Sequence, residues 1–142
     1  CQGDIKAQYM LGECFYFGFG LEQDYRQAIY WFKRAAEYDL PQAYFNLGLC
    51  YYDGNGVKQD YEEASKYFKK AAEQNFPLAQ YYLGQCYYNG EGIEQNYEKA
   101  VELFKKTIKD DLPPAQFALG VCYYNGEGVE QDYEEAIRNL RN

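Results

Sequence analysis

The chain contains no histidine among its 142 residues, and only one tryptophan, one methionine and four prolines. Histidine is the side chain that most often supplies acid–base chemistry near neutral pH, and it is the commonest metal ligand. No two cysteines stand at CxxC spacing either, which argues against a zinc site. Without a serine or lysine constellation that would activate a nucleophile, we expect no catalytic residues, no metal and no cofactor.

Cations and long apolar runs are also scarce. There are 14 Lys and Arg residues against 22 Asp and Glu, a formal charge of −8. The short basic runs, each late in a predicted helix where cations offset the helix dipole, are Lys33-Arg34, Lys69-Lys70 and Lys105-Lys106. The sequence thus predicts no nucleic-acid partner. No apolar run approaches the roughly 20 residues of a membrane span, so we expect no membrane insertion by this segment.

A fixed period of 36 residues is the main positive feature. A Leu-Gly pair recurs without insertion or deletion at Leu11-Gly12, Leu47-Gly48, Leu83-Gly84 and Leu119-Gly120. A period of this length indicates a supersecondary unit stacked on copies of itself. With position 1 at Ala7, Ala43, Ala79 and Ala115, the repeats span about 7–42, 43–78, 79–114 and 115–142.

The first half of each repeat has the spacing of a helix, which we call helix A. Positions 1, 5, 8 and 12 recur at helical intervals and form one stripe, so helix A of the first repeat should run from about residue 5 to 17. Prolines mark the start of the later A helices, because proline is tolerated in the first helical turn. Two glycines, at positions 12 and 14, should close the helix and form a tight turn.

The second half predicts another helix, helix B. Its N-cap residues are Asp24, Asp60, Asn96 and Asp132. A glutamine or glutamate three places later predicts a capping box in three repeats, with Gln27, Glu63 and Glu135, whereas Lys99 breaks it in the third. Helix B should end near Tyr38, Gln74 and Asp110, and the chain should turn at Asp39, Asn75 and Asp111. The predicted fold is all-α: a right-handed α-α superhelix (solenoid) of about four 36-residue helix-turn-helix repeats.

The residues that carry a family resemblance run through the whole chain. The segment Ala43-Tyr-Phe-Asn-Leu-Gly-Leu-Cys-Tyr-Tyr-Asp-Gly-Asn-Gly-Val57 is followed by Asp60-Tyr61, Ala64, Tyr67-Phe68 and Ala71-Ala72. This pattern resembles the Sel1-like repeat family, a relative of the tetratricopeptide repeat, whose period is 34 residues. The resemblance implies an adaptor or scaffold protein that assembles other proteins and has no shared enzymatic activity.

The repeat frame extends to both ends of the sequence. Residues 1–6 occupy the register of 37–42, and the last residue occupies that of Arg34. Terminal repeats normally carry a polar cap, and neither end of this sequence has the pattern of one. We therefore expect residues 1–142 to form a single repeat domain that is a segment of a longer array.

Four cysteines occupy position 8: Cys14, Cys50, Cys86 and Cys122. They lie on the apolar stripe, and stacked helices are about 8–10 Å apart, whereas a disulfide needs Cα atoms within about 7 Å. We therefore expect reduced, buried core thiols. Reduced thiols weakly favour a cytoplasmic location.

The side of helix A away from the stripe is the predicted binding surface, the concave face of the solenoid. Positions 3 and 10 are aromatic in every repeat, and positions 7 and 11 vary. The candidate partner-binding residues, from positions 7, 10 and 11, are Glu13, Tyr16, Phe17, Leu49, Tyr52, Asp53, Gln85, Tyr88, Asn89, Val121, Tyr124 and Asn125. An alternative reading is that the aromatic residues at positions 3 and 10 are largely buried between neighbouring repeats.

Three functions remain open from the sequence. The favoured one is a non-enzymatic protein–protein interaction module that binds a peptide or helix of a protein partner. The second is a structural, self-associating repeat array. The third, and weakest, is a hydrolase.

Overall fold

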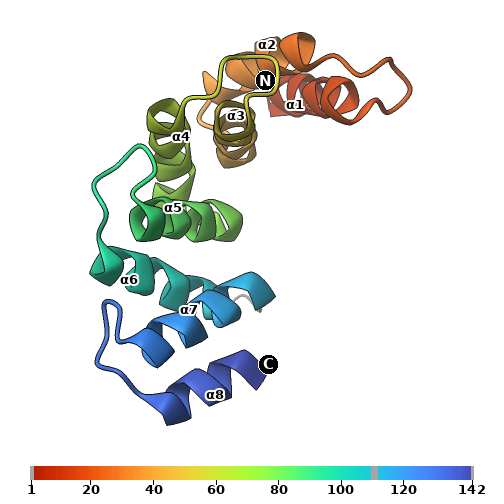
Figure 1. Ribbon diagram of the computed structural model, residues 1–142. Helices are drawn as coiled ribbons and strands as arrows, with labels where there is room; N and C mark the ends of the chain where they lie inside the picture. Colours follow the sequence, from red (N-terminus) through yellow and green to blue (C-terminus); the bar gives the residue numbers. More distant parts are fainter. Residues whose placement is uncertain (1, 110–111, 142) are drawn as a thin grey trace. The chain divides into compact units, whose positions relative to one another are not determined.

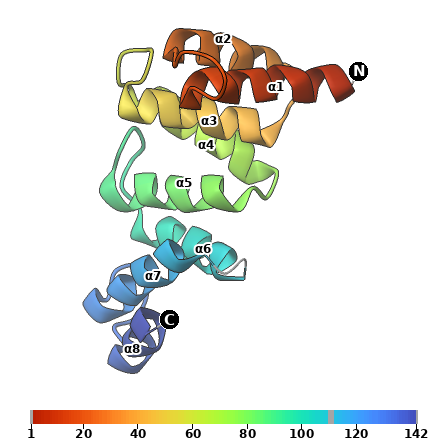
Figure 2. The same ribbon diagram turned by 90° about the vertical axis from the view of Figure 1, so that its right-hand side faces the viewer.

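The computed structural model describes residues 2–109 and 112–141, and helices account for all regular structure in these ranges. Figure 1 shows the helices in chain order, and Figure 2 gives the second view. Their bounds are α1 Gln2–Phe17, α2 Tyr25–Ala36, α3 Pro41–Asp53, α4 Tyr61–Glu73, α5 Pro77–Asn89, α6 Tyr97–Ile108, α7 Pro113–Asn125 and α8 Tyr133–Arg141. The predicted all-α repeat fold is confirmed: odd-numbered helices are A helices and even-numbered helices are B helices.

The chain divides into two compact units, the first ending at Gln74 and the second beginning at Asn75. In the first unit α1 packs on α2, α2 on α3 and α3 on α4. In the second unit α5, α6, α7 and α8 pack in the same sequential order. Each unit therefore holds two repeats, in which a B helix lies between two A helices. Within the described residues, no helix combines the length and apolarity needed to cross a membrane.

Local chemistry sets the ends of the A helices as predicted. Pro41 occupies the first turn of α3, and Gly54 closes that helix with a left-handed φ of 73°. Proline lacks the N–H that would be unpaired at this place, and glycine adopts positive φ without strain. Helix α1 begins at Gln2 rather than near residue 5. No proline precedes Ala7, so no residue there is forced out of the helical region.

The B helices are capped more simply than the sequence predicts. Asp60 accepts hydrogen bonds from the backbone N–H groups of Glu62 and Glu63, at 3.0 and 3.1 Å. The expected capping box is wrong, however, because the N–H of Asp60 already donates to the carbonyl of Tyr51 at 2.8 Å. The same bond to helix A recurs at Asp24, Asn96 and Asp132. The side chains of Gln27, Glu63 and Glu135 are therefore not needed at the cap, and Lys99 costs the third repeat nothing there.

The chain turns after helix B at Asp39 and Asn75, as predicted, and both residues adopt the left-handed conformation. Asp39 has a φ of 60° and Asn75 has a φ of 63°. Short polar side chains tolerate this conformation better than other non-glycine residues. The corresponding expectations for Asp110 and Asp111 lie outside the described residues.

Close contact between the two helices of one repeat explains the recurring Leu-Gly pair. A Cβ added at Gly48 would lie 2.5 Å from Cε1 of Phe68. In the third repeat, a Cβ at Gly84 would lie 2.8 Å from Cε1 of Phe104. Both rings are fully buried. Glycine at position 6 therefore lets the phenylalanine of helix B approach the backbone of helix A.

The predicted stripe forms the core in the later repeats. Ala43, Leu47 and Cys50 of α3 are fully buried. In the second unit the core cluster contains Ala100, Val101 and Phe104 of α6 with Leu119 and Cys122 of α7.

The first repeat departs from this pattern. Ala7 is exposed, and Leu11 and Cys14 are half-buried. The equivalent stripe of α3 is buried in contact with α2, the B helix of the preceding repeat. Burial of the stripe therefore depends on a preceding B helix as well as on the repeat's own sequence.

Candidate interaction surface

The tyrosines at position 10 pack against helix B of their own repeat. Ring centroids at positions 10 and 19 are 5.0 to 5.4 Å apart in the pairs Tyr16–Tyr25, Tyr52–Tyr61, Tyr88–Tyr97 and Tyr124–Tyr133. Such edge or tilted contacts are the favoured geometry for aromatic pairs. The first three position-10 rings are half-buried, and Tyr124 is 55% exposed. Each ring therefore has one side fixed by packing.

A glutamine at position 17 holds this aromatic pair in every repeat. In the second repeat, Nε2 of Gln59 donates to the carbonyl of Tyr52 at 2.9 Å and to the hydroxyl of Tyr61 at 3.4 Å. Gln23, Gln95 and Gln131 make the same two bonds. Sequence reasoning gave this glutamine no role, although its presence with a tyrosine at position 19 in all four repeats was the available signal.

Hydroxyl groups at position 10 reach the turn of the following repeat. The hydroxyl of Tyr88 donates to Oε1 of Glu127 at 2.5 Å. Burial and this carboxylate raise the pKa of Tyr88. Tyr16 pairs with the side chain of Asn55 in the opposite sense, as the acceptor. Burial raises the pKa of Tyr16, and this bond lowers it by a smaller amount. Position 13, which the sequence did not single out, therefore belongs to the surface.

Position 3 has a different environment in each repeat. The hydroxyl of Tyr9 accepts a hydrogen bond from Asn46 at 3.0 Å and donates to Glu13 at 3.2 Å. Burial, followed by the charge of Glu13, raises the pKa of Tyr9 to about 12. Phe45 is buried, whereas Phe117 is 63% exposed. The alternative that position 3 is a buried packing residue therefore holds for Phe45 and not for Phe117.

The variable positions 7 and 11 are half-buried or exposed. The position-7 residues Glu13, Leu49, Gln85 and Val121 are half-buried. The position-11 residues Phe17, Asp53, Asn89 and Asn125 are exposed. Phe17 stacks on Phe19 with ring centroids 5.3 Å apart. Positions 7 and 10 share the surface of helix A, and position 11 lies at its C-terminal end.

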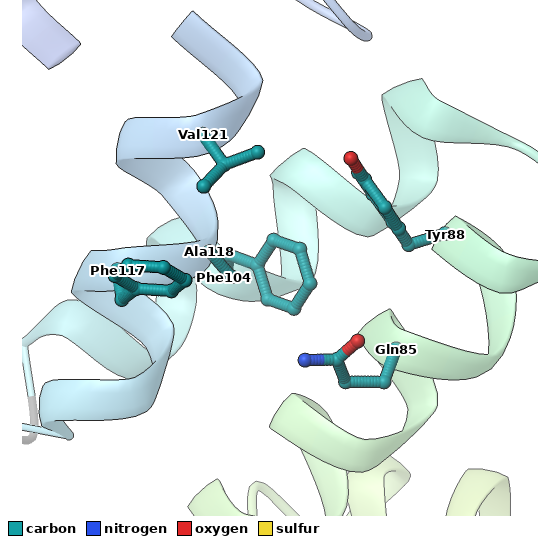
Figure 3. Close-up of a pocket in the computed structure, with 6 residues that line it drawn as sticks. All are labelled: Gln85, Tyr88, Phe104, Phe117, Ala118 and Val121. Atoms are coloured by element: carbon teal, nitrogen blue, oxygen red, sulfur yellow. The ribbon is translucent and has the colours of Figure 1, made fainter. Parts of the chain in front are cut away.

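The second unit has a pocket on this surface. Its volume is about 180 Å³, and its lining residues are Gln85, Tyr88, Phe104, Phe117, Ala118 and Val121. Figure 3 shows residues of α5 and α7 facing each other, with the ring of Phe104 of α6 between them. Three candidate residues, Gln85, Tyr88 and Val121, meet here. Phe104 and Ala118 were not predicted as site residues.

A small side chain at position 4 leaves room for this pocket. In the first unit position 4 of the second repeat is Asn46, which spans to Tyr9 of the preceding repeat. In the second unit the equivalent residue is Ala118, which has no polar group to make that bond. The hydroxyl of Tyr81 instead accepts a hydrogen bond from Gln85 at 2.6 Å, within α5.

The cysteines of the three later repeats lie in the core, behind the surface. Cys50, Cys86 and Cys122 are fully buried free thiols, as predicted, and Cys14 is a half-buried free thiol. Burial raises the pKa of Cys50 and Cys86 to about 12 and that of Cys122 to about 11. A thiol with so high a pKa is a poor nucleophile at neutral pH. In the described part of the chain, no group of three or more acidic or sulfur ligands is arranged to hold a metal ion.

Comparison with known proteins identifies the repeat. The Sel1 repeat family matches residues 5–37, 41–76, 77–111 and 113–141. A protective antigen of uropathogenic Escherichia coli with an SLR fold is 39% identical, with a TM-score of 0.94 over 99% of this chain and 30% of the antigen. A Sel1 repeat protein from Oxalobacter formigenes is 33% identical, with a TM-score of 0.89 over 97% of this chain and 57% of that protein.

The chain is shorter than both of these relatives, spanning less than two thirds of either. Cysteine rich protein B of Helicobacter pylori has the same fold, at 22% identity and a TM-score of 0.62. None of the curated proteins searched matches the chain significantly.

Proposed function

Because the chain belongs to the Sel1 repeat family, we propose that it is a protein-interaction module whose A-helix surface binds a peptide or helix of a partner protein. Proteins of this family generally act as protein-interaction scaffolds, and the family is typically non-enzymatic. Beyond this general role, we assign the binding surface to the A helices and a peptide or helix as the ligand.

The main support for this binding surface is that aromatic rings held in place by packing lie beside residues that vary between repeats. Tyr52 and Tyr88 each have one side held by packing within the repeat, and each remains partly accessible. Rigid tyrosines offer contact area at little cost in conformational entropy. Beside them, Leu49 and Gln85 differ in chemistry at the same repeat position. Such a surface supplies affinity through shared residues and specificity through variable ones.

Site-specific photo-crosslinking tests this proposal. A photoreactive side chain is placed at Leu49 in the first unit or Val121 in the second, and the chain is irradiated in a lysate of its source organism. Matched controls carry the same group at Lys69 and Glu102, which are exposed on B helices. We expect discrete protein adducts from the A-helix positions and none of these adducts from the controls. Equal adduct patterns from both sets would contradict the assignment of the surface.

A further inference from the structure

We propose that the pocket of the second unit binds one aromatic or leucyl side chain of a partner peptide, and that basic residues flank this side chain. This inference rests on the proposed function and specifies the chemistry of the ligand. It commits to a peptide because the pocket is small, apolar and open on the surface of helix A.

The size of the pocket selects a single side chain. Its volume is about 180 Å³, whereas sites for whole small molecules commonly measure about 300–1,000 Å³. An apolar cavity of about 150 Å³ accommodates benzene. One phenyl ring or one leucyl group therefore matches the space.

The lining of the pocket gives the chemistry of that side chain. Phe104 is fully buried, and Phe117, Ala118 and Val121 contribute apolar atoms from α7. Gln85 and Tyr88 bring polar groups to the opposite side. The amide oxygen of Gln85 and the hydroxyl oxygen of Tyr88, whose proton is directed to Glu127, can accept hydrogen bonds from the backbone of a peptide whose apolar side chain enters between the two A helices. The arrangement matches an anchor pocket with a polar border.

Charge on this surface selects the flanking residues. The A helices of the second unit and the turns after them, 77–96 and 113–132, contain no lysine or arginine. Their charged residues are Glu91, Glu94, Glu127, Glu130 and Asp132. Glu127 is tied to the pocket through its hydrogen bond with Tyr88.

The lysines and arginines of this unit belong to its B helices and the turn that follows α6, and two of them pack on tyrosines of the A helices. Nζ of Lys99 lies 5.4 Å from the ring centroid of Tyr87, and Nζ of Lys105 lies 5.9 Å from that of Tyr123. Both tyrosines occupy position 9. At about 100° per residue, position 9 points at least roughly 100° around the helix axis away from the pocket positions 3, 7 and 10. The charged side chains on the A helices and the turns after them are therefore all acidic in this unit, which favours lysine or arginine beside the anchor.

The test uses a displayed library of random twelve-residue peptides, selected on the wild-type chain and counter-selected on Ala118→Leu. The added leucyl atoms fill the pocket, and circular dichroism confirms the fold. A matched control, Glu102→Leu, adds the same group on the exposed face of α6. A second variant, Val121→Lys, replaces one apolar lining residue and adds a positive charge beside the pocket.

We expect enriched peptides that carry an aromatic residue or leucine next to lysine or arginine. A fluorescein-labelled copy of the enriched peptide should lose about tenfold or more in affinity on Ala118→Leu and on Val121→Lys, and none on Glu102→Leu. Glu127→Gln keeps an acceptor for Tyr88 but removes the charge. It should weaken this peptide by about two- to fivefold and leave a copy with glutamine in place of its basic residues unchanged.

Two results would overturn the inference. One is the absence of peptides that prefer the wild-type chain over Ala118→Leu. The other is enrichment of peptides that are acidic or lack an apolar anchor. If crosslinking at Leu49 still captures a partner in either case, the proposed function stands and only the pocket chemistry is wrong.

Discussion

Substitution of Gly48 by alanine separates intrinsic helix propensity from packing, because the two effects have opposite signs. In an unhindered helix interior, glycine to alanine stabilises by about 1 kcal/mol. Here the new Cβ would lie 2.5 Å from Cε1 of Phe68, and the nearest three contacts are all atoms of that ring. Ordinary carbon contacts are about 3.5–4.0 Å, so the ring or helix α3 must move by roughly 1 Å.

Phe68 is fully buried, so its ring cannot swing out to solvent without losing its place in the core. Overpacking of this kind costs about 1–3 kcal/mol, and the shift required here places it near the upper value. Subtracting the gain of about 1 kcal/mol in helix propensity leaves a net loss of about 2 kcal/mol in the free energy of unfolding. Urea unfolding followed by circular dichroism measures this loss.

A double-mutant cycle makes the test specific. In a Phe68→Ala background the side chain that would meet the new Cβ is absent, so Gly48→Ala should be neutral or stabilising by up to about 1 kcal/mol. If Gly48→Ala stabilises the wild-type chain, or destabilises both backgrounds equally, the close contact is not the reason for glycine at position 6.

The turn glutamine, the cap of helix B and a buried cysteine can each be tested by a single substitution. Gln131→Ala removes two hydrogen bonds that join the turn to Tyr124 of α7 and to Tyr133 of α8. The free energy of unfolding should fall by about 0.5–1.5 kcal/mol in urea titrations. No change would mean that solvent replaces both bonds. Asp60→Ala should lower the free energy of unfolding by about 1 kcal/mol in the same titration, because it removes the cap of α4. Glu63→Ala should lower it by under about 0.5 kcal/mol. Equal losses would show that Glu63 also caps the helix. Burial raises the pKa of Cys50 to about 12 from an ordinary 9.0, so the folded state holds this proton more tightly than the unfolded state. The free energy of unfolding should therefore fall as pH rises from about 9 towards 12, by up to about 1.4 kcal/mol per pH unit. Cys50→Ala should flatten that slope, and parallel slopes for the two proteins would contradict this account.

Sequence reasoning located the helices well because their ends are set by local chemistry. Pro41 and Gly54 bound α3, and Asp60 caps α4, without help from distant residues. The resemblance to Sel1 repeats, carried by the same positions, was confirmed. That the four repeats form one domain within a longer array stays a prediction.

The features that the sequence missed depend on contacts between helices. The N–H of Asp60 bonds to Tyr51 of helix A, which removes the need for a capping box. The pocket exists because Ala118 of one repeat lies near Gln85 and Tyr88 of the preceding one. Position-by-position comparison treats the repeats as equal, so it could not show the hollow between α5 and α7. Whether the twelve candidate residues bind a partner also stays a prediction.

The measurement that tests the binding surface most directly is a map of amide chemical shifts in the ¹⁵N-labelled chain during titration with the selected peptide. We expect the largest changes on α5 and α7, at Gln85, Ala118 and Val121, and no change on the exposed face of α6 around Glu102. The largest changes on α6 or α8, with α5 and α7 silent, would contradict binding at the A-helix surface.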